Sequence, residues 1–228
     1  MRIIMYALIA IGLTASVYAV PLDLYNDVLT YEGGGIVATA DWDNPETGLS
    51  WNIFQVDPDL WRYEYVWQTG GSDVSHIVLE LTEGAIAADF SNWQYMYADV
   101  ESGSPEFGWF SPNQGNSNPG MPAAVYGLKL DIASDTDVFG FAFETWRTPV
   151  WGDVYAKGGR HAMGTDADGG FTYAYNVGLT VDDVDLNDGY HVAVPNGYAV
   201  SDPGVTAALL GLAVAGMDRM RRRLNKGA

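Results

Sequence analysis

The sequence predicts an all-β protein, an antiparallel β-sandwich with a jelly-roll-like order of strands. Three observations lead to this fold class. Apolar or aromatic residues alternate with polar ones in several short runs, which is the period of a half-buried strand. Turn-forming Gly, Pro, Asn and Asp separate these runs at short intervals. No long helical pattern lies between the two apolar ends of the chain, so one-sided strands are expected to pack face to face as two sheets.

The clearest strand is predicted at 60–69. Its aromatic residues lie on one face and are expected to form core or a covered surface: Trp61, Tyr63, Tyr65 and Trp67. The opposite face carries Arg62, Glu64, Val66 and Gln68. A turn at 70–73 and a second alternating run at 74–81 follow, and we interpret the two runs as a hairpin.

Further strands are predicted at 36–42, 49–56, 107–110, 125–132, 138–145, 151–157, 171–179 and 192–194. Phe139, Phe141 and Phe143 share one face, and each contributes about 1.5–3 kcal/mol when buried, so all three are expected in the core. The segment 85–99 is expected to hold one helical turn around Phe90 and Trp93. The segment 102–122, rich in Gly, Pro, Ser and Asn, is either a recognition loop or a simple surface crossover.

The N-terminus has the pattern of a secretory signal peptide. Arg2 supplies a positive charge, an apolar stretch covers 3–13, and Val17 and Ala19 place small residues before a cleavage point. We therefore expect a signal peptide at 1–19 and a single domain at 20–197. The alternative is an N-terminal anchor or core helix.

The composition of the body limits its partners. Between the two apolar ends lie 5 basic and 27 acidic side chains, which give a formal charge of −22. Such a field repels nucleic acid and anionic polysaccharide, and it attracts divalent cations. It is equally compatible with a saline habitat, where salt screens self-repulsion. The chain has no cysteine, so its stability depends on a buried core.

The C-terminal segment 198–228 combines three parts in a fixed order. Asp202, Pro203 and Gly204 form a short motif, and an uncharged run of 13 residues follows at 205–217. As a helix this run spans about 20 Å, which is short for a bilayer. A basic cluster closes the segment with Arg219, Arg221, Arg222 and Arg223; arginines of this kind can snorkel, and they favour the cytoplasmic side. The alternative is an amphipathic helix docked on the domain.

This order of parts resembles the PEP-CTERM class of C-terminal sorting signals, most closely its VPDSG-like variant. Val200, Asp202 and Gly204 fit the pattern, whereas Ser201 replaces the expected proline and Pro203 holds the fourth position. The resemblance covers about 25 residues. It implies transient anchoring in the membrane, cleavage by an exosortase-like membrane protease, and delivery to the cell surface or extracellular matrix. The phrases SHIVLEL and PVWGDVYAKGG resemble an uncharacterised domain of other exported proteins with such tails.

Two acidic turns are candidates for Ca²⁺, the one cofactor that the sequence suggests. They carry Asp166 and Asp168, and Asp183, Asp185 and Asp188. Oxygen ligands at alternating positions before a glycine can wrap this ion, but the second turn lacks the sixth-position Gly and twelfth-position Glu of an EF-hand. Plain solvated turns are the alternative.

Aromatic residues near loops are candidates for stacking on sugar rings. Trp109, Trp146 and Trp151 lie in such places. No nucleophile, phosphate loop or metal-ligand spacing is found, and His76 on an alternating strand is expected to be structural. Glu80, Glu144 or Asp89 could supply a glycosidase pair, but with so many acids a chance pair is expected. The sequence thus favours a non-enzymatic, surface-delivered protein; the alternative is an exported glycan-binding or glycan-active protein.

Overall fold

The computed structural model describes residues 25–112, 117–133, 135–160, 171–180 and 190–197. These residues form an all-β, antiparallel body of β-sandwich type. The predicted signal peptide at 1–19 and the predicted tail at 198–228 lie outside the described residues. Helical structure within the described ranges is limited to short 3-10 turns.

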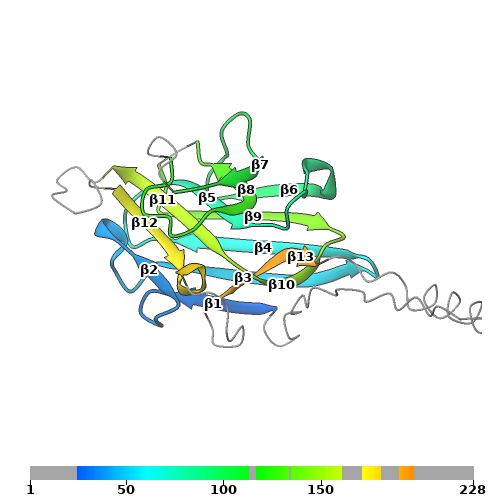
Figure 1. Cartoon of the computed structure of the whole chain (residues 1–228), viewed down its shortest axis with the longest axis horizontal. Coiled ribbons are helices and arrows are strands. Elements are labelled where there is room, and N and C mark those ends of the chain that lie inside the picture. Colours follow the sequence, from blue (N-terminus) through cyan, green and yellow to red (C-terminus); the bar gives the residue numbers. More distant parts are fainter. Residues whose placement is uncertain (1–24, 113–116, 134, 161–170, 181–189, 198–228) are drawn as a thin grey trace, which may run out of the picture.

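Two sheets form the layers of the body (Figure 1). One has five strands in the order β1-β3-β4-β9-β6, and the other has six in the order β2-β12-β11-β5-β8-β7. The five-stranded sheet consists of β1 (Asn26–Thr30), β3 (Gly48–Asp57), β4 (Leu60–Gln68), β9 (Val138–Thr145) and β6 (Phe90–Met96). The six-stranded sheet consists of β2 (Ile36–Ala38), β12 (Phe171–Asn176), β11 (Val154–Arg160), β5 (Val74–Glu80), β8 (Val125–Asp131) and β7 (Glu106–Phe110).

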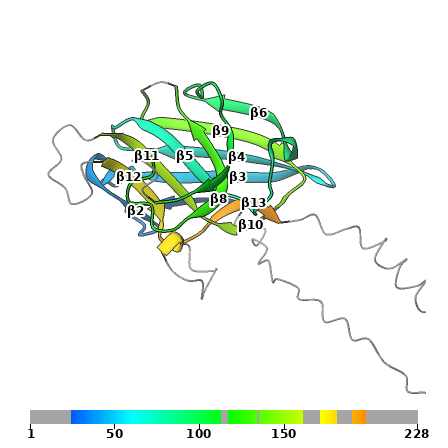
Figure 2. The ribbon, with the colours of Figure 1, turned by 45° about the horizontal axis from the view of Figure 1, so that its top comes forward.

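A separate two-stranded ribbon joins β10 (Thr148–Gly152) to β13 (Val192–Gly197). Both views show it at the lower right of the body (Figure 1, Figure 2), and its strand β13 contacts β5 of the six-stranded sheet. Its buried residues Val150, Val192 and Val194 belong to the same apolar cluster as the inner faces of the two sheets. The ribbon therefore helps to close the core between the layers.

Aromatic side chains of β4 and β9 form the centre of the core, as the alternation predicts. Tyr63, Tyr65, Phe141 and Phe143 are fully buried, and the Tyr65 and Phe141 rings stack with their centroids 5.0 Å apart. The register places Tyr63 opposite Phe143 on the neighbouring strand, so the rings form paired columns. Such cross-strand aromatic pairs add about 0.5–1.5 kcal/mol each beyond their burial.

The predicted hairpin between 60–69 and 74–81 is wrong. Strand β4 pairs with β3 and β9, whereas β5 pairs with β11 and β8 in the other sheet. The intervening turn crosses between the layers, and its first residue donates from Thr69 N to Asp137 O at 2.8 Å. The hairpin partner of β4 is β3, through the tight link at Pro58 and Asp59. Alternation identifies strands, but it does not say which strands pair.

Several other segments differ from the prediction. The strands expected at 36–42 and 171–179 end at Ala38 and Asn176 and are followed by the 3-10 turns η2 (Ala40–Trp42) and η4 (Val177–Thr180), and strand β1 was not predicted. The segment expected to be one strand at 151–157 breaks at Asp153, which separates β10 from β11 in different sheets. The segment expected to contain a helical turn around Phe90 and Trp93 has only the 3-10 turn η3 (Ala87–Asp89) and then continues as strand β6. A register shift between Ser91 and Gln94 interrupts the alternation there and hides the strand pattern.

Part of the long Gly- and Pro-rich segment covers the outer face of the six-stranded sheet. Met121 packs in a second apolar cluster with Tyr155 and Tyr173. Asn118 is buried and lies with its Oδ1 3.1 Å from the Nε2 of His76, while Tyr155 Oη donates to Pro119 O at 2.8 Å. The part of this segment at 117–121 is therefore a packed lid on the sheet rather than a free loop.

Candidate functional site

The open outer face of the five-stranded sheet carries a continuous set of polar side chains. We call this set the outer polar array, and it consists of Asn52, Arg62, Glu64, Asn92, Gln94 and Glu144. They come from four adjacent strands, β3, β4, β9 and β6. Neighbouring strands lie about 4.8 Å apart, so the array extends about 14 Å across the sheet.

Arg62 lies at the centre of the outer polar array. Its Nε donates to Glu64 Oε1 at 2.8 Å, one Nη donates to Gln94 Oε1 at 2.6 Å, and the other lies 3.6 Å from Glu144 Oε1. Asn52 donates to the second oxygen of Glu64 at 3.1 Å. The arginine thus bridges three strands and holds two carboxylates apart in fixed positions.

Strand alternation and one irregularity position these groups. On β4 the residues that alternate with the buried aromatics point outward, which places Arg62 and Glu64 on the same face. On β6 the register shift brings Asn92 over β9, where its amide donates to Glu144. Asn92 has φ 50°, a left-handed conformation that Asn tolerates better than most residues. Bulges of this kind commonly redirect a side chain.

Apolar groups and a hollow border the array. Phe54 stands opposite Arg62 in the pairing of β3 with β4 and is 39% exposed. Toward the β1 edge, a hollow of about 120 Å³ lies between Val28, Ser50, Val66 and neighbouring side chains. Val28 itself is 52% exposed. The face therefore combines ordered polar groups with accessible apolar surface, which is typical of ligand sites.

A second polar cluster is buried where β5, β10–β11, β12 and β13 meet. The carboxylate of Glu80 accepts from Asp153 N at 2.8 Å. Asp153 Oδ1 in turn lies 3.2 Å from His191 Nδ1 and accepts from Asn176 Nδ2 at 2.7 Å. Asn176 Oδ1 accepts from Val154 N at 2.7 Å. The cluster holds the corner at Asp153 at which the chain passes from one sheet to the other.

Burial raises the pKa of Glu80 to about 7, and the nearby Asp153 carboxylate acts in the same direction. The space beside it is tight, because a Cβ on Gly152 would lie 2.4 Å from Val194 Cγ2 and 3.0 Å from Glu80 Oε2. A titratable acid next to an Asp–His pair can take part in proton transfer. Its contacts here are to backbone and to structural side chains, which favours a role in stability.

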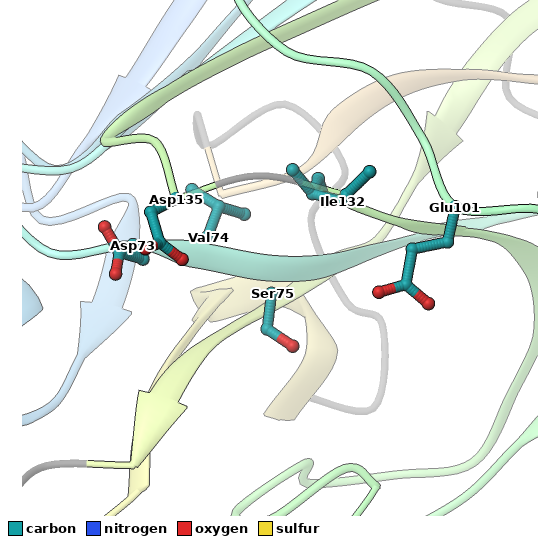
Figure 3. A pocket seen from close by; sticks show the side chains of 7 residues that line it. Asp73, Val74, Ser75, Glu101, Ile132 and Asp135 are labelled. Carbon is teal, nitrogen blue, oxygen red and sulfur yellow. The ribbon is translucent and has the colours of Figure 1, made fainter.

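A hollow of about 290 Å³ opens on an acidic surface (Figure 3). Asp73 and Asp135 lie at one end of it and Glu101 at the other, with Ser75 between them. In the part of the chain that the structure describes, no group of three or more acidic, His or Cys side chains is arranged to hold a metal ion. The described residues that line the hollow make it an acidic depression.

The three tryptophans that the sequence suggests for stacking lie in different surroundings. Trp109 on β7 is 54% exposed and meets Tyr126 edge-on at 5.8 Å. Trp146 follows β9, is 37% exposed and lies under the guanidinium of Arg147 at 5.0 Å. Trp151 on β10 packs against the core. The structure leaves Trp109 as the most accessible of the three.

The carboxylates considered for a glycosidase pair make no hydrogen bond or ion pair with one another within the described part of the chain. Glu80 lies in the buried cluster and Glu144 in the outer polar array. Asp89 accepts from Arg147 Nη2 at 2.8 Å. His76 is buried, as expected of a structural residue: burial lowers its pKa to about 3, and Lys129 adds to that effect.

Other candidates fall outside the described residues. These are the possible Ca²⁺ ligands Asp166, Asp168, Asp183, Asp185 and Asp188. The sorting motif (Val200, Asp202, Pro203, Gly204) and the basic cluster (Arg219, Arg221, Arg222, Arg223) lie there as well. Among the helices of the described ranges, none is long and apolar enough to cross a membrane.

Sequence reasoning did not identify the outer polar array. It placed Arg62 and Glu64 on the polar face of a strand, but it paired that strand with 74–81 instead of with β3 and β9. Polar residues at the outward positions of four strands are visible in the sequence. Only the correct strand pairing brings these residues together. Comparisons with family models, with curated proteins and with solved structures give no match.

Proposed function

We propose that this chain is an exported, non-enzymatic protein of the cell surface or extracellular matrix, processed through a PEP-CTERM-like tail by an exosortase-like membrane protease. One structural observation supports this proposal: the described body begins and ends at the same end of the sandwich. The jelly-roll strand order, the N-terminal signal helix and the C-terminal sorting helix expected from the sequence are parts of the same proposal.

The shared end follows from a chain of contacts. Tyr25, the first described residue, meets the Trp61 ring edge-on at 5.5 Å. Trp61 at the start of β4 pairs with Thr145 at the end of β9. A short link leads from there to Thr148, which pairs with Gly197 at the end of β13. Tyr25 and Gly197, the first and last described residues, therefore lie at one end of the sandwich, and the other end of the body is free to face away from a membrane.

The charge distribution supports the same orientation. The acidic body carries −22, whereas the four arginines of the tail are crowded within five residues. A basic cluster beyond an apolar run favours the cytoplasmic side of a membrane, which leaves the acidic body outside. After cleavage the body would keep its high solubility through self-repulsion.

A second candidate is an exported glycan-binding or glycan-active protein. The outer polar array with the exposed Phe54 beside it is the observation that favours it. Binding fits better than hydrolysis, because Arg62 contacts both Glu64 and Glu144. A hydrolytic pair needs one carboxyl that is free to act as a proton donor.

The test is tail processing in a host that has an exosortase. We expect the wild-type chain to be cleaved and its body to be accessible to protease added outside intact cells. Asp202→Ala with Gly204→Ala should leave an uncleaved chain in the membrane fraction, because the motif is lost. Thr206→Ala, in the adjacent apolar run, is the matched control and should be processed normally. Equal processing of all three chains, or a body protected inside intact cells, would contradict the proposal.

A further inference from the structure

We propose that the outer polar array is a binding site for a neutral polysaccharide. This goes beyond delivery to the surface, since it assigns a site and a class of ligand to the body itself. The ligand would lie across β3, β4, β9 and β6, with its rings over Arg62 and its neighbours. The array's extent of about 14 Å fits an oligosaccharide segment better than a single sugar.

The array is ordered before any ligand arrives. Each of its six members is held by at least one hydrogen bond or ion pair to another member. The side chain of Arg62 is only 13% exposed and that of Glu144 15%, whereas Glu64 retains 33%. Groups fixed in this way lose little conformational entropy on binding, which favours affinity.

The open hydrogen-bonding positions of the array are of both kinds. Among the described residues, no hydrogen bond reaches Asn52 Oδ1, Asn92 Oδ1 or Gln94 Nε2. The first two are acceptors and the third is a donor. An anion would use only donors and a metal ion only acceptors, whereas sugar hydroxyls donate and accept. The carboxylates of Glu64 and Glu144 have further lone pairs for hydroxyl donors.

Charge narrows the ligand class further. Within the array, one arginine faces two glutamates, so the local formal charge is −1. The surrounding body is strongly acidic, which disfavours a polyanion and disfavours a second copy of this chain. A protein partner would bury the remaining exposed part of these charged side chains, whereas interface cores are depleted of charged residues.

Phe54 and the hollow next to β1 supply the apolar part of the site. Phe54 is in register with Arg62, so a ring stacked on it would reach the central polar groups. The hollow bounded by Val28, Ser50 and Val66 lies one outward row away from Asn52 and Glu64. It can take a neighbouring ring of the same polymer.

The experiment is affinity electrophoresis of the full chain through gels that contain dextran, xylan or mannan, with polygalacturonate as the anionic comparison. We expect retardation by at least one neutral polymer and none by polygalacturonate. Asn52→Ala and Gln94→Ala should each raise the dissociation constant obtained from the retardation at least tenfold. Glu106→Gln on β7 of the other sheet is the control, and it should bind as the wild type does. Trp109→Ala distinguishes the outer polar array from a stacking site on that other sheet. Melting curves of the variants will show that they remain folded.

Several results would overturn the inference. These are no binding to any neutral polymer, preference for polygalacturonate, or loss of binding with Trp109→Ala but not with Asn52→Ala. Release of reducing sugars from a bound polymer would show that the protein hydrolyses its ligand instead of only binding it. None of these outcomes bears on tail processing, so failure here and failure of the export proposal are distinguishable.

Discussion

Tyr65 Oη donates a hydrogen bond of 2.7 Å to the carbonyl oxygen of Ala193, at the centre of the core. The two residues are far apart in the sequence and belong to β4 and β13. Tyr65 is fully buried and stacks on Phe141, so its hydroxyl has a fixed position. The bond therefore ties the last described strand, from which the chain continues toward its tail, to the middle of the five-stranded sheet.

We expect Tyr65→Phe to lower the free energy of unfolding by about 1–2 kcal/mol, because a buried hydrogen bond is lost without a change in packing. Tyr97→Phe is the matched control, since Tyr97 is 71% exposed and its change should be near zero. Chemical denaturation of both variants measures the difference. An equal effect in the two variants would show that the bond to Ala193 contributes nothing to stability.

Glu80 predicts a specific pH dependence. Burial raises its folded pKa to about 7 from an ordinary value of 4.5, so the folded state binds this proton more tightly than the unfolded state does. The stabilising contribution is complete below about pH 4.5 and is lost as the pH rises through about 7. Glu80→Gln keeps an acceptor for Asp153 N and removes the charge. We expect the free energy of unfolding of Glu80→Gln to exceed that of the wild type by about 2–3 kcal/mol at about pH 8 and to equal it at about pH 4.

The measurement is the difference in unfolding free energy between Glu80→Gln and wild type across that range. The difference cancels the effect of the many other acids, which titrate alike in both proteins. A difference that is flat with pH would show that folding does not raise the pKa of Glu80 above its value in the unfolded chain.

Asp89 neutralises a buried guanidinium. Its Oδ2 accepts from Arg147 Nη2 at 2.8 Å and Nε at 3.2 Å, and the arginine side chain is only 3% exposed. We expect Asp89→Asn to cost about 3 kcal/mol, because it removes a carboxylate that pairs with the buried guanidinium. Asp131→Asn breaks the more exposed pair with Lys129 and should cost less than about 1 kcal/mol. Thermal unfolding compares the two; a reversed order would contradict this account of Arg147.

Thr172 is a place where a substitution should stabilise the fold. Its side chain is buried on β12, and its Oγ1 has no hydrogen-bond partner within the described part of the chain. Thr172→Val removes this unsatisfied group at almost constant volume, and we expect a gain of about 1 kcal/mol. In Thr69→Val the lost hydroxyl bonds to Ser72 O and Asp137 O, so that variant should lose stability. Denaturant midpoints of the two variants should therefore move in opposite directions.

The sequence was informative where one face of a strand is fully apolar. The alternation of Tyr63 and Tyr65 with charged residues, and of Phe141 and Phe143 with Gly and Ala, places these rings in the core, where the structure has them. Period-2 patterns report burial directly, and burial needs no knowledge of the partner strand.

The alternation of residues along the sequence does not predict strand pairing, corners or bulges. The tight turn between β4 and β5 is a crossover because Thr69 and Val74 bond to the 136–137 segment, which is distant in sequence. The bulge in β6 removes the alternation that would identify it. The outer polar array depends on both features, so it emerges only when β3, β4, β9 and β6 are placed side by side.

The most direct test of the proposed export is the intact mass of the protein recovered from outside the cell in a host with an exosortase. The proposal predicts a chain that begins at Val20 and ends at or near the motif formed by Asp202, Pro203 and Gly204. A mass that corresponds to the uncut chain, with both Met1 and Ala228 present and the protein dissolved in the cytosol, would contradict it.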